Sequence, residues 1–133
     1  MNDMADGGLG REARRTAVGS VMRAVPTCAA DLPRGGLEEL LPGHGEVVVL
    51  DPDGRPVGVV GFADLGRQGV TAGALFHPLA LALDRNVPLS VAAAVMAHDC
   101  VDRIAIVGEG RRFLGLLTCR DVLGWLAREA GHR

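Results

Sequence analysis

The sequence contains two similar halves, and this internal repeat constrains the fold more than any other feature. When Gly58 is aligned with Gly115, at a shift of 57 (115 − 58), Asp64 falls on Asp121. Val- or Ile-rich runs precede both glycines, and an apolar residue follows both aspartates. Repetition on this scale indicates two copies of one structural unit, so it has to be weighed before any local pattern.

The segments that lead into the halves, 18–22 and 72–76, also align, at a shift of 54 (72 − 18). The repeats are therefore expected at 16–69 and 70–130. Residues 1–15 are Gly-rich and charged and lack apolar periodicity, which predicts a disordered tail. One unit of about 60 residues would have a marginal core. Two units that bury their sheets against each other would solve that problem.

Each half is predicted to have the order β-α-β-β-α. In the second half, a strand at 79–83 precedes a helix at 89–98, since Pro88 stands at a position that favours a helix start. An apolar run, a Gly-containing turn and a second apolar run then predict a β-hairpin. A helix at 119–129 closes the unit. The predicted buried faces of the two helices comprise Val91, Ala94, Val95 and Met96, and Val122, Leu123, Leu126 and Ala130.

The first half repeats this order with a stronger turn signal and a weaker helix. The sequence Asp51-Pro-Asp-Gly54 is typical of a tight turn, because Asp and Pro initiate turns and Gly accepts positive φ. The leading helix, at 37–41, is cut off by Pro42 and Gly43 and is expected to be little more than one turn long.

Composition and charge argue against several classes of function. The net charge of −2 disfavours nucleic-acid binding, and no apolar run approaches the roughly 20 residues of a membrane helix. Cys28, Cys100 and Cys119 form no CxxC pair, and no two histidines have ligand spacing, so no metal site is expected. No nucleophile and base stand in a recognisable context. We therefore expect a non-catalytic cytoplasmic protein with no catalytic residues.

The ordered series of motifs resembles the CBS domain family, and in particular a stand-alone pair of CBS repeats, known as a Bateman module. The features that carry the resemblance are Val18-Gly-Ser-Val-Met22, the apolar strand before Asp51-Pro-Asp-Gly54, and Gly115-LLTCR-Asp121. It covers about residues 17–129. It implies an α+β fold of two β-α-β-β-α repeats packed as an intramolecular pseudo-twofold pair.

The resemblance also implies a regulatory module that binds an adenosine-containing ligand in the cleft between its repeats. The ligand would be AMP, ATP or S-adenosylmethionine, and no cofactor would be required. Thr118 and the adjoining helix N-terminus would face a phosphate, Asp121 would accept hydrogen bonds from ribose hydroxyls, and Arg103 would reach phosphates. Arg120 and Val101 complete the candidate ligand-binding set.

These residues also have ordinary structural interpretations. Thr118 and Asp121 have the spacing of a capping box, which stabilises a helix without any ligand. Arg103 could equally pair with Asp99 or Asp102 at the surface. The alternative to a ligand sensor is therefore a ligand-free dimerisation or interaction module whose binding motifs are relics.

The first repeat is degenerate at two of these positions. Glu46 stands where the second repeat has Arg103, and Gly61 stands where it has Thr118. A carboxylate repels phosphate and glycine offers no hydroxyl, so one ligand per chain is predicted.

The resemblance implies a homodimer through the repeat helices. Trp125 and the apolar face at Val91, Val95 and Leu126 offer surface that one small module alone is not expected to bury, and a second module would cover it. The resemblance further implies a regulated protein partner, which the sequence does not identify.

Overall fold

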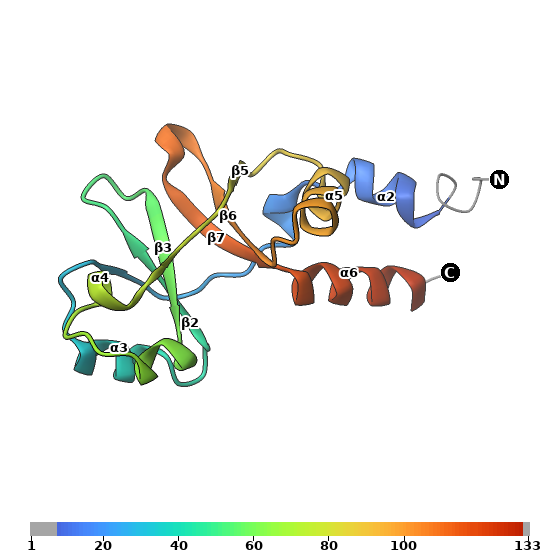
Figure 1. Cartoon of the computed structure of the whole chain (residues 1–133). Coiled ribbons are helices and arrows are strands. Elements are labelled where there is room, and N and C mark those ends of the chain that lie inside the picture. Colours follow the sequence, from blue (N-terminus) through green and yellow to red (C-terminus); the bar gives the residue numbers. More distant parts are fainter. Residues whose placement is uncertain (1–7, 132–133) are drawn as a thin grey trace. The chain divides into compact units, whose positions relative to one another are not determined.

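The computed structural model describes residues 8–131, which divide into two compact units (Figure 1). One unit comprises 24–79 and 109–113, and the other comprises 80–108 together with described residues from both ends of the chain. The compact units therefore differ from the sequence repeats in their leading segments. The leading segment of the first repeat, up to Arg23, packs with the rest of the second repeat, and the leading segment of the second repeat, up to Leu79, packs with the rest of the first.

The unit built on the first repeat contains a four-stranded sheet in the order β1-β2-β3-β4. Strand β1 is parallel to β2, and the other neighbours are antiparallel. Its elements in chain order are β1 (Thr27–Ala29), α3 (Arg34–Leu40), β2 (Glu46–Leu50), β3 (Pro56–Gly61), the 3-10 helix η2 (Phe62–Gly66), α4 (Ala72–Leu75) and β4 (His77–Pro78).

Alternate residues of β2 and β3 point toward α3 and α4 and form the core of this unit. The buried cluster consists of Leu37, Leu41, Val47, Val49, Val60, Ala72 and Leu75. The β2–β3 turn is held by Asp51, whose Oδ1 accepts hydrogen bonds from the backbone N–H groups of Asp53 and Arg55, both at 2.9 Å. Gly54 has φ +83°, so the predicted tight turn is present and uses glycine where a side chain would be strained.

The unit built on the second repeat contains a three-stranded sheet in the order β5-β6-β7. Its elements are α2 (Leu9–Arg15), the 3-10 helix η1 (Val18–Ser20), β5 (Ala82–Asp84), α5 (Leu89–Asp99), β6 (Arg103–Val107), β7 (Phe113–Thr118) and α6 (Cys119–Gly131). A further 3-10 turn, η3 (Glu109–Arg111), connects β6 and β7. The buried cluster joins helices and sheet through Val18, Leu89, Ala92, Met96, Ile104, Ile106, Leu117, Val122 and Trp125.

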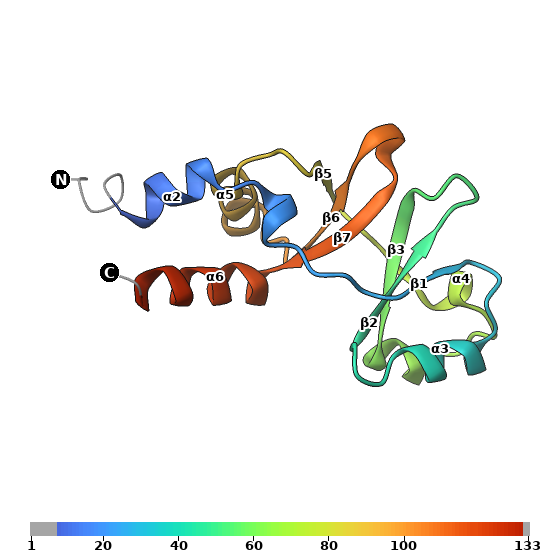
Figure 2. The same ribbon diagram turned by 180° about the vertical axis from the view of Figure 1, so that it is seen from behind.

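Residues Leu9–Arg15, which the sequence predicted to be disordered, form helix α2. It packs against α5 and α6, and α2 lies beside α5 in both views (Figures 1 and 2). Ala13 contacts the core cluster, while Glu12 in the first turn and Arg14 and Arg15 in the last turn suit the helix dipole. This packing explains why the charged segment Leu9–Arg15 forms a helix. The rest of the predicted tail, residues 1–7, lies outside the described residues.

The predicted buried faces of α5 and α6 were partly wrong. Helix α5 buries Leu89, Ala92 and Met96, whereas Val91 is 43% exposed. In α6, Val122 and Trp125 are buried, so Trp125 does not offer the exposed surface that the sequence suggested. Leu123, assigned to the buried face, is 64% exposed.

Strand pairing confirms the repeat and both of its shifts. Val59 pairs with His77 in the first unit, and Leu116 forms the equivalent bridge with Arg23 in the second. The sequence numbers of the two pairs differ by 57 on one side (116 − 59) and by 54 on the other (77 − 23). The second unit follows the predicted order β-α-β-β-α, and the first follows it with the 3-10 helix η2 in place of the closing α-helix, so the α+β prediction is confirmed. Within residues 8–131, no helix combines the length and the apolar character needed to cross a membrane.

Candidate functional site

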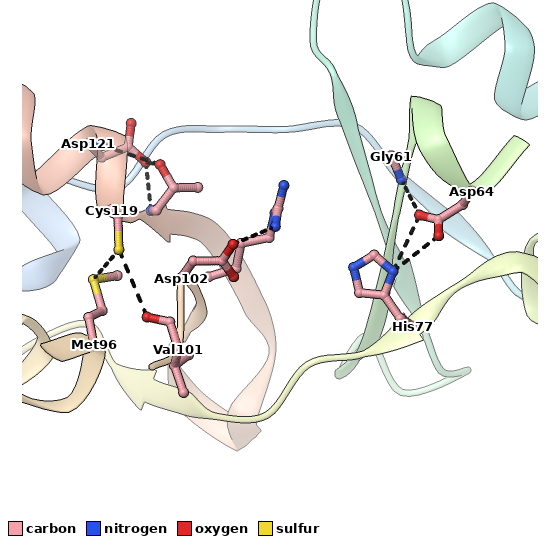
Figure 3. Close-up of polar contacts among 10 residues, drawn as sticks. Gly61, Asp64, His77, Met96, Val101, Asp102, Cys119 and Asp121 are labelled. Carbon is pink, nitrogen blue, oxygen red and sulfur yellow. Dashed lines mark hydrogen bonds and ion pairs between the residues drawn. The ribbon is translucent and has the colours of Figure 1, made fainter. Parts of the chain in front are cut away.

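The start of α6 places Thr118 and Asp121 in direct contact. Thr118 is the last residue of β7, and its backbone N–H and its hydroxyl donate to Asp121 Oδ2 at 2.8 and 2.9 Å. In return, the backbone N–H of Asp121 donates to Thr118 Oγ1 at 3.2 Å. The predicted capping box is therefore formed. One carboxylate oxygen of Asp121 carries these contacts, which fixes the orientation of the other oxygen (Figure 3).

The second carboxylate oxygen of Asp121 faces an arginine that the sequence reading did not single out. Arg23 Nε lies 3.5 Å from Asp121 Oδ1. The Arg23 backbone is held by two hydrogen bonds with Leu116, one in each direction, both at 3.0 Å. The signal that could have revealed Arg23 is its place directly after Met22, at the end of the repeated leading motif.

The remaining predicted ligand residues lie near the same end of the sheet. Arg103 begins β6 and Thr118 ends β7, and these strands are neighbours joined by a short connection. Arg103 Nη1 lies 3.1 Å from Asp102 Oδ2, so the surface pairing considered above is present. Arg120, the second residue of α6, is exposed. The Val101 carbonyl oxygen is 3.9 Å from Cys119 Sγ (Figure 3).

In the first repeat, the aspartate equivalent to Asp121 is more deeply engaged. Asp64 is 8% exposed and accepts a hydrogen bond from the Gly61 backbone N–H at 2.8 Å. His77 Nδ1 lies 3.3 Å from its carboxylate (Figure 3). Arg67 Nη1 lies 3.5 Å from the same carboxylate. Gly61 supplies no hydroxyl, so only one direction of the capping box exists here. Glu46, at the position of Arg103, is buried.

The cysteines differ in their surroundings. Cys119 packs near Met96, with 3.7 Å between the sulfurs, whereas Cys100 is exposed. Burial and the nearby Asp31 carboxylate raise the pKa of the Cys28 thiol.

Across the described part of the chain, no three His, Cys, Asp or Glu side chains gather as a metal site would require.

Comparison with known proteins identifies a family for the second half of the chain. The CBS domain family model matches residues 79–128. A comparison with curated proteins finds no match.

Solved structures match almost the whole chain. The CBS domain of the bacterial CNNM/CorC family Mg2+ transporter in complex with ATP has a TM-score of 0.76 and 20% identity, over 90% of this chain and 92% of that one. The CBS domain pair of protein MJ0100, in complex with 5′-methylthioadenosine and S-adenosyl-L-methionine, has a TM-score of 0.70 and 17% identity, over 84% and 99%. CBSX2 in complex with AMP has a TM-score of 0.72 and 22% identity, over 85% and 97%.

Proposed function

Because residues 79–128 are a CBS domain and the chain has the fold of a CBS domain pair, we propose that it is a non-catalytic regulatory module that binds an adenosine-containing ligand. The similar structures named above hold ATP, AMP, 5′-methylthioadenosine or S-adenosylmethionine, and adenosine is the part these ligands share. In this proposal the second repeat binds the ligand, once per chain. A protein partner would respond to the ligand-bound form.

The geometry of Asp121 is the observation that carries this proposal. Its Oδ2 takes both capping bonds from Thr118, while its Oδ1 makes a long contact, of 3.5 Å, to Arg23. An oriented carboxylate oxygen of this kind is suited to accept hydrogen bonds from a ribose diol. The N-terminus of α6, a helix of 13 residues, adds a partial positive charge for a phosphate. Arg103 would supply a guanidinium for the phosphate.

Isothermal titration calorimetry with AMP, ATP and S-adenosylmethionine tests the proposal. Hydrogen bonds to charged groups contribute about 1.5–3 kcal/mol each. Asp121→Ala should therefore weaken binding roughly ten- to a hundredfold. Asp64→Ala is the matched control and should leave affinity unchanged, since Gly61 and Glu46 replace the ligand groups of that repeat. Equal losses from both variants would contradict the single-site assignment.

The capping box requires a second variant. Asp121→Ala removes a helix cap as well as a ligand group, so its loss of affinity could reflect a loosened fold. Asp121→Asn keeps the shape and one acceptor, and thermal unfolding of both variants separates the two effects. A variant that melts like the wild type but binds weakly would support a direct role.

The alternative function, a ligand-free dimerisation module, has its own support. The contacts between Thr118 and Asp121 are fully explained by helix capping, which needs no ligand. If no adenosine compound binds the wild-type chain at millimolar concentration, this alternative replaces the sensor.

We also propose that the module is a homodimer through α5 and α6. Leu123 is 64% exposed and Val91 43%. Beside Leu123 is an apolar hollow of about 230 Å3, lined by Ala93, Met96, Ala97, Cys119, Val122 and Leu123. A second copy of the chain is the occupant that this surface favours, because apolar area of this kind is usually covered.

The free cysteines fit a reducing compartment such as the cytoplasm.

A further inference from the structure

We propose that Arg23 makes the second repeat select phosphate-bearing adenosine ligands over uncharged or cationic ones. Arg23 would exchange its contact with Asp121 for a contact with the ligand phosphate. This inference rests on the proposed function and narrows the ligand class that function names.

The two carboxylate oxygens of Asp121 have different partners, and the exchange follows from this difference. Oδ2 is committed to the Thr118 backbone and hydroxyl, so a ligand hydroxyl has to be accepted at Oδ1. Oδ1 is the oxygen that Arg23 faces, at 3.5 Å. A ribose diol that hydrogen-bonds to Oδ1 therefore competes with the Arg23 guanidinium for the same atom.

The contact between Arg23 and Asp121 is easily exchanged. The Arg23 side chain is 39% exposed, the Nε–Oδ1 distance is long, and ion pairs near solvent contribute little net stability. The Arg23 backbone stays in place because its N–H and C=O both bond to Leu116 at 3.0 Å. The side chain can thus turn from the carboxylate to a phosphate while its anchor in the sheet remains.

The charges around the start of α6 decide which ligand benefits. Arg23 lies beside Asp121, Arg103 pairs with Asp102, and Arg120 is an exposed residue in the first turn of α6. A ligand that occupies Oδ1 and brings a phosphate gives the displaced guanidinium a new, bidentate partner. Adenosine occupies the same oxygen but brings no phosphate for Arg23 to bind, and the sulfonium of S-adenosylmethionine adds repulsion.

The first repeat lacks this arrangement, which places the selection in the second. At the position of Arg23 it has His77, and the carboxylate of Asp64 is shared by His77, Arg67 and the Gly61 backbone. Asp64 is also more buried than Asp121, at 11% against 15% side-chain exposure. Both oxygens of Asp64 are therefore engaged by groups of its own unit, Oδ1 by His77 and Arg67 and Oδ2 by the Gly61 N–H and His77.

Calorimetry with AMP and adenosine, on the full chain, tests the inference. The wild type should bind AMP at least about tenfold more tightly than adenosine, the effect of one charge-assisted contact. Arg23→Ala should bring the two affinities within about threefold by weakening AMP, while adenosine binds as well as before or better. Arg112→Ala, which removes an exposed arginine from the other unit, is the matched control and should keep the wild-type ratio.

The outcomes separate this inference from the proposed function. If both ligands bind and Arg23→Ala keeps the wild-type ratio, the inference is overturned and the proposed function stands. If the wild type binds neither ligand, both fail. Arg23→Gln keeps the aliphatic stem and the polarity of the side chain without its charge. It should give the same ratio of AMP to adenosine affinity as Arg23→Ala. It therefore decides the question if the alanine variant unfolds, which a melting curve would reveal.

Discussion

Arg23 and His77 occupy the same position in the two halves of the chain, and each lies beside the aspartate in the first turn of the last helix of its repeat. Arg23 Nε is 3.5 Å from Asp121 and His77 Nδ1 is 3.3 Å from Asp64. The architecture of the two sites is thus shared, while the basic group differs. A permanent guanidinium cation stands at one and an imidazole at the other.

Asp64 is expected to stabilise the fold rather than bind a ligand. Asp64→Ala should lower the free energy of unfolding by about 1–3 kcal/mol, since it leaves the Gly61 N–H without its acceptor and removes the carboxylate that faces Arg67. Urea denaturation followed by circular dichroism measures the loss. Asp53→Ala, in the exposed turn, is the control and should change stability by less than about 0.5 kcal/mol. Equal effects at both positions would contradict this role.

Gly58 is predicted to be the most sensitive glycine of the first unit. A Cβ at Gly58 would overlap the Phe76 ring and lie 2.8 Å from the His77 carbonyl oxygen. Gly58→Ala should therefore cost about 2 kcal/mol or more, as overpacking against a ring and backbone does. The midpoint of urea unfolding measures this cost.

Two other glycines test the steric argument. At Gly115, the equivalent position, the nearest atom to a Cβ is the Met22 sulfur at 2.7 Å, which belongs to a flexible side chain. Gly115→Ala should thus cost less than Gly58→Ala. Gly35 lies in α3 with nothing within 4 Å, so Gly35→Ala should stabilise the protein by about 0.5–1 kcal/mol. A reversal of this order would rule out the overlap as the cause.

Cys28 should react with iodoacetamide more slowly than Cys100. Burial and Asp31 raise the pKa of the Cys28 thiol, whereas Cys100 is exposed. The pKa of the Cys28 thiol is higher in the folded chain than in the unfolded chain. Cys28 therefore makes its full contribution to stability at pH values below the unfolded pKa. This contribution is lost as pH rises through the folded pKa. Cys28→Ala should remove this alkaline loss, and labelling followed by mass spectrometry gives the order of reaction. Faster labelling of Cys28 would contradict the prediction.

The homodimer should depend on Leu123. Leu123→Arg places a charge beside the apolar hollow of α5 and α6 and should convert the dimer to a 13.9 kDa monomer in sedimentation velocity. Val70→Arg changes a residue that is 78% exposed in the other unit, and it should leave the dimer intact. A wild-type chain that sediments only as a monomer at micromolar concentration would refute the proposed interface.

The elements that the sequence predicted well are those with strong local signals. The turn at Asp51–Gly54 follows from residues that can adopt few other conformations. The buried face of α5 could not be read in the same way. Almost every residue of Leu89–Ala97 is apolar. The alternation of apolar and polar residues that would show which side of the helix is buried is therefore missing.

In the candidate site, too, the sequence predicted the contact that has a local signal and missed the one that does not. The spacing of Thr118 and Asp121 predicted their contact, because a capping box is a local motif. Arg23 was missed because it stands near the opposite end of the sequence from Asp121 and reaches it only through a leading segment that packs with the other repeat. Sequence reading that assigns each leading segment to the repeat beside it cannot bring these two residues together.

The exchange of leading segments has a consequence for the order in which the chain can fold during synthesis. The Thr16 carbonyl accepts a hydrogen bond from the Leu89 N–H at 2.7 Å, and the Val18 N–H donates to the Val87 carbonyl at 2.8 Å. The leading segment of the first repeat therefore pairs only with residues that are made after the rest of that repeat. The core of the first unit, which lies within residues 37–75, is complete before then. The unit that carries Asp121 closes last, after α6 has emerged.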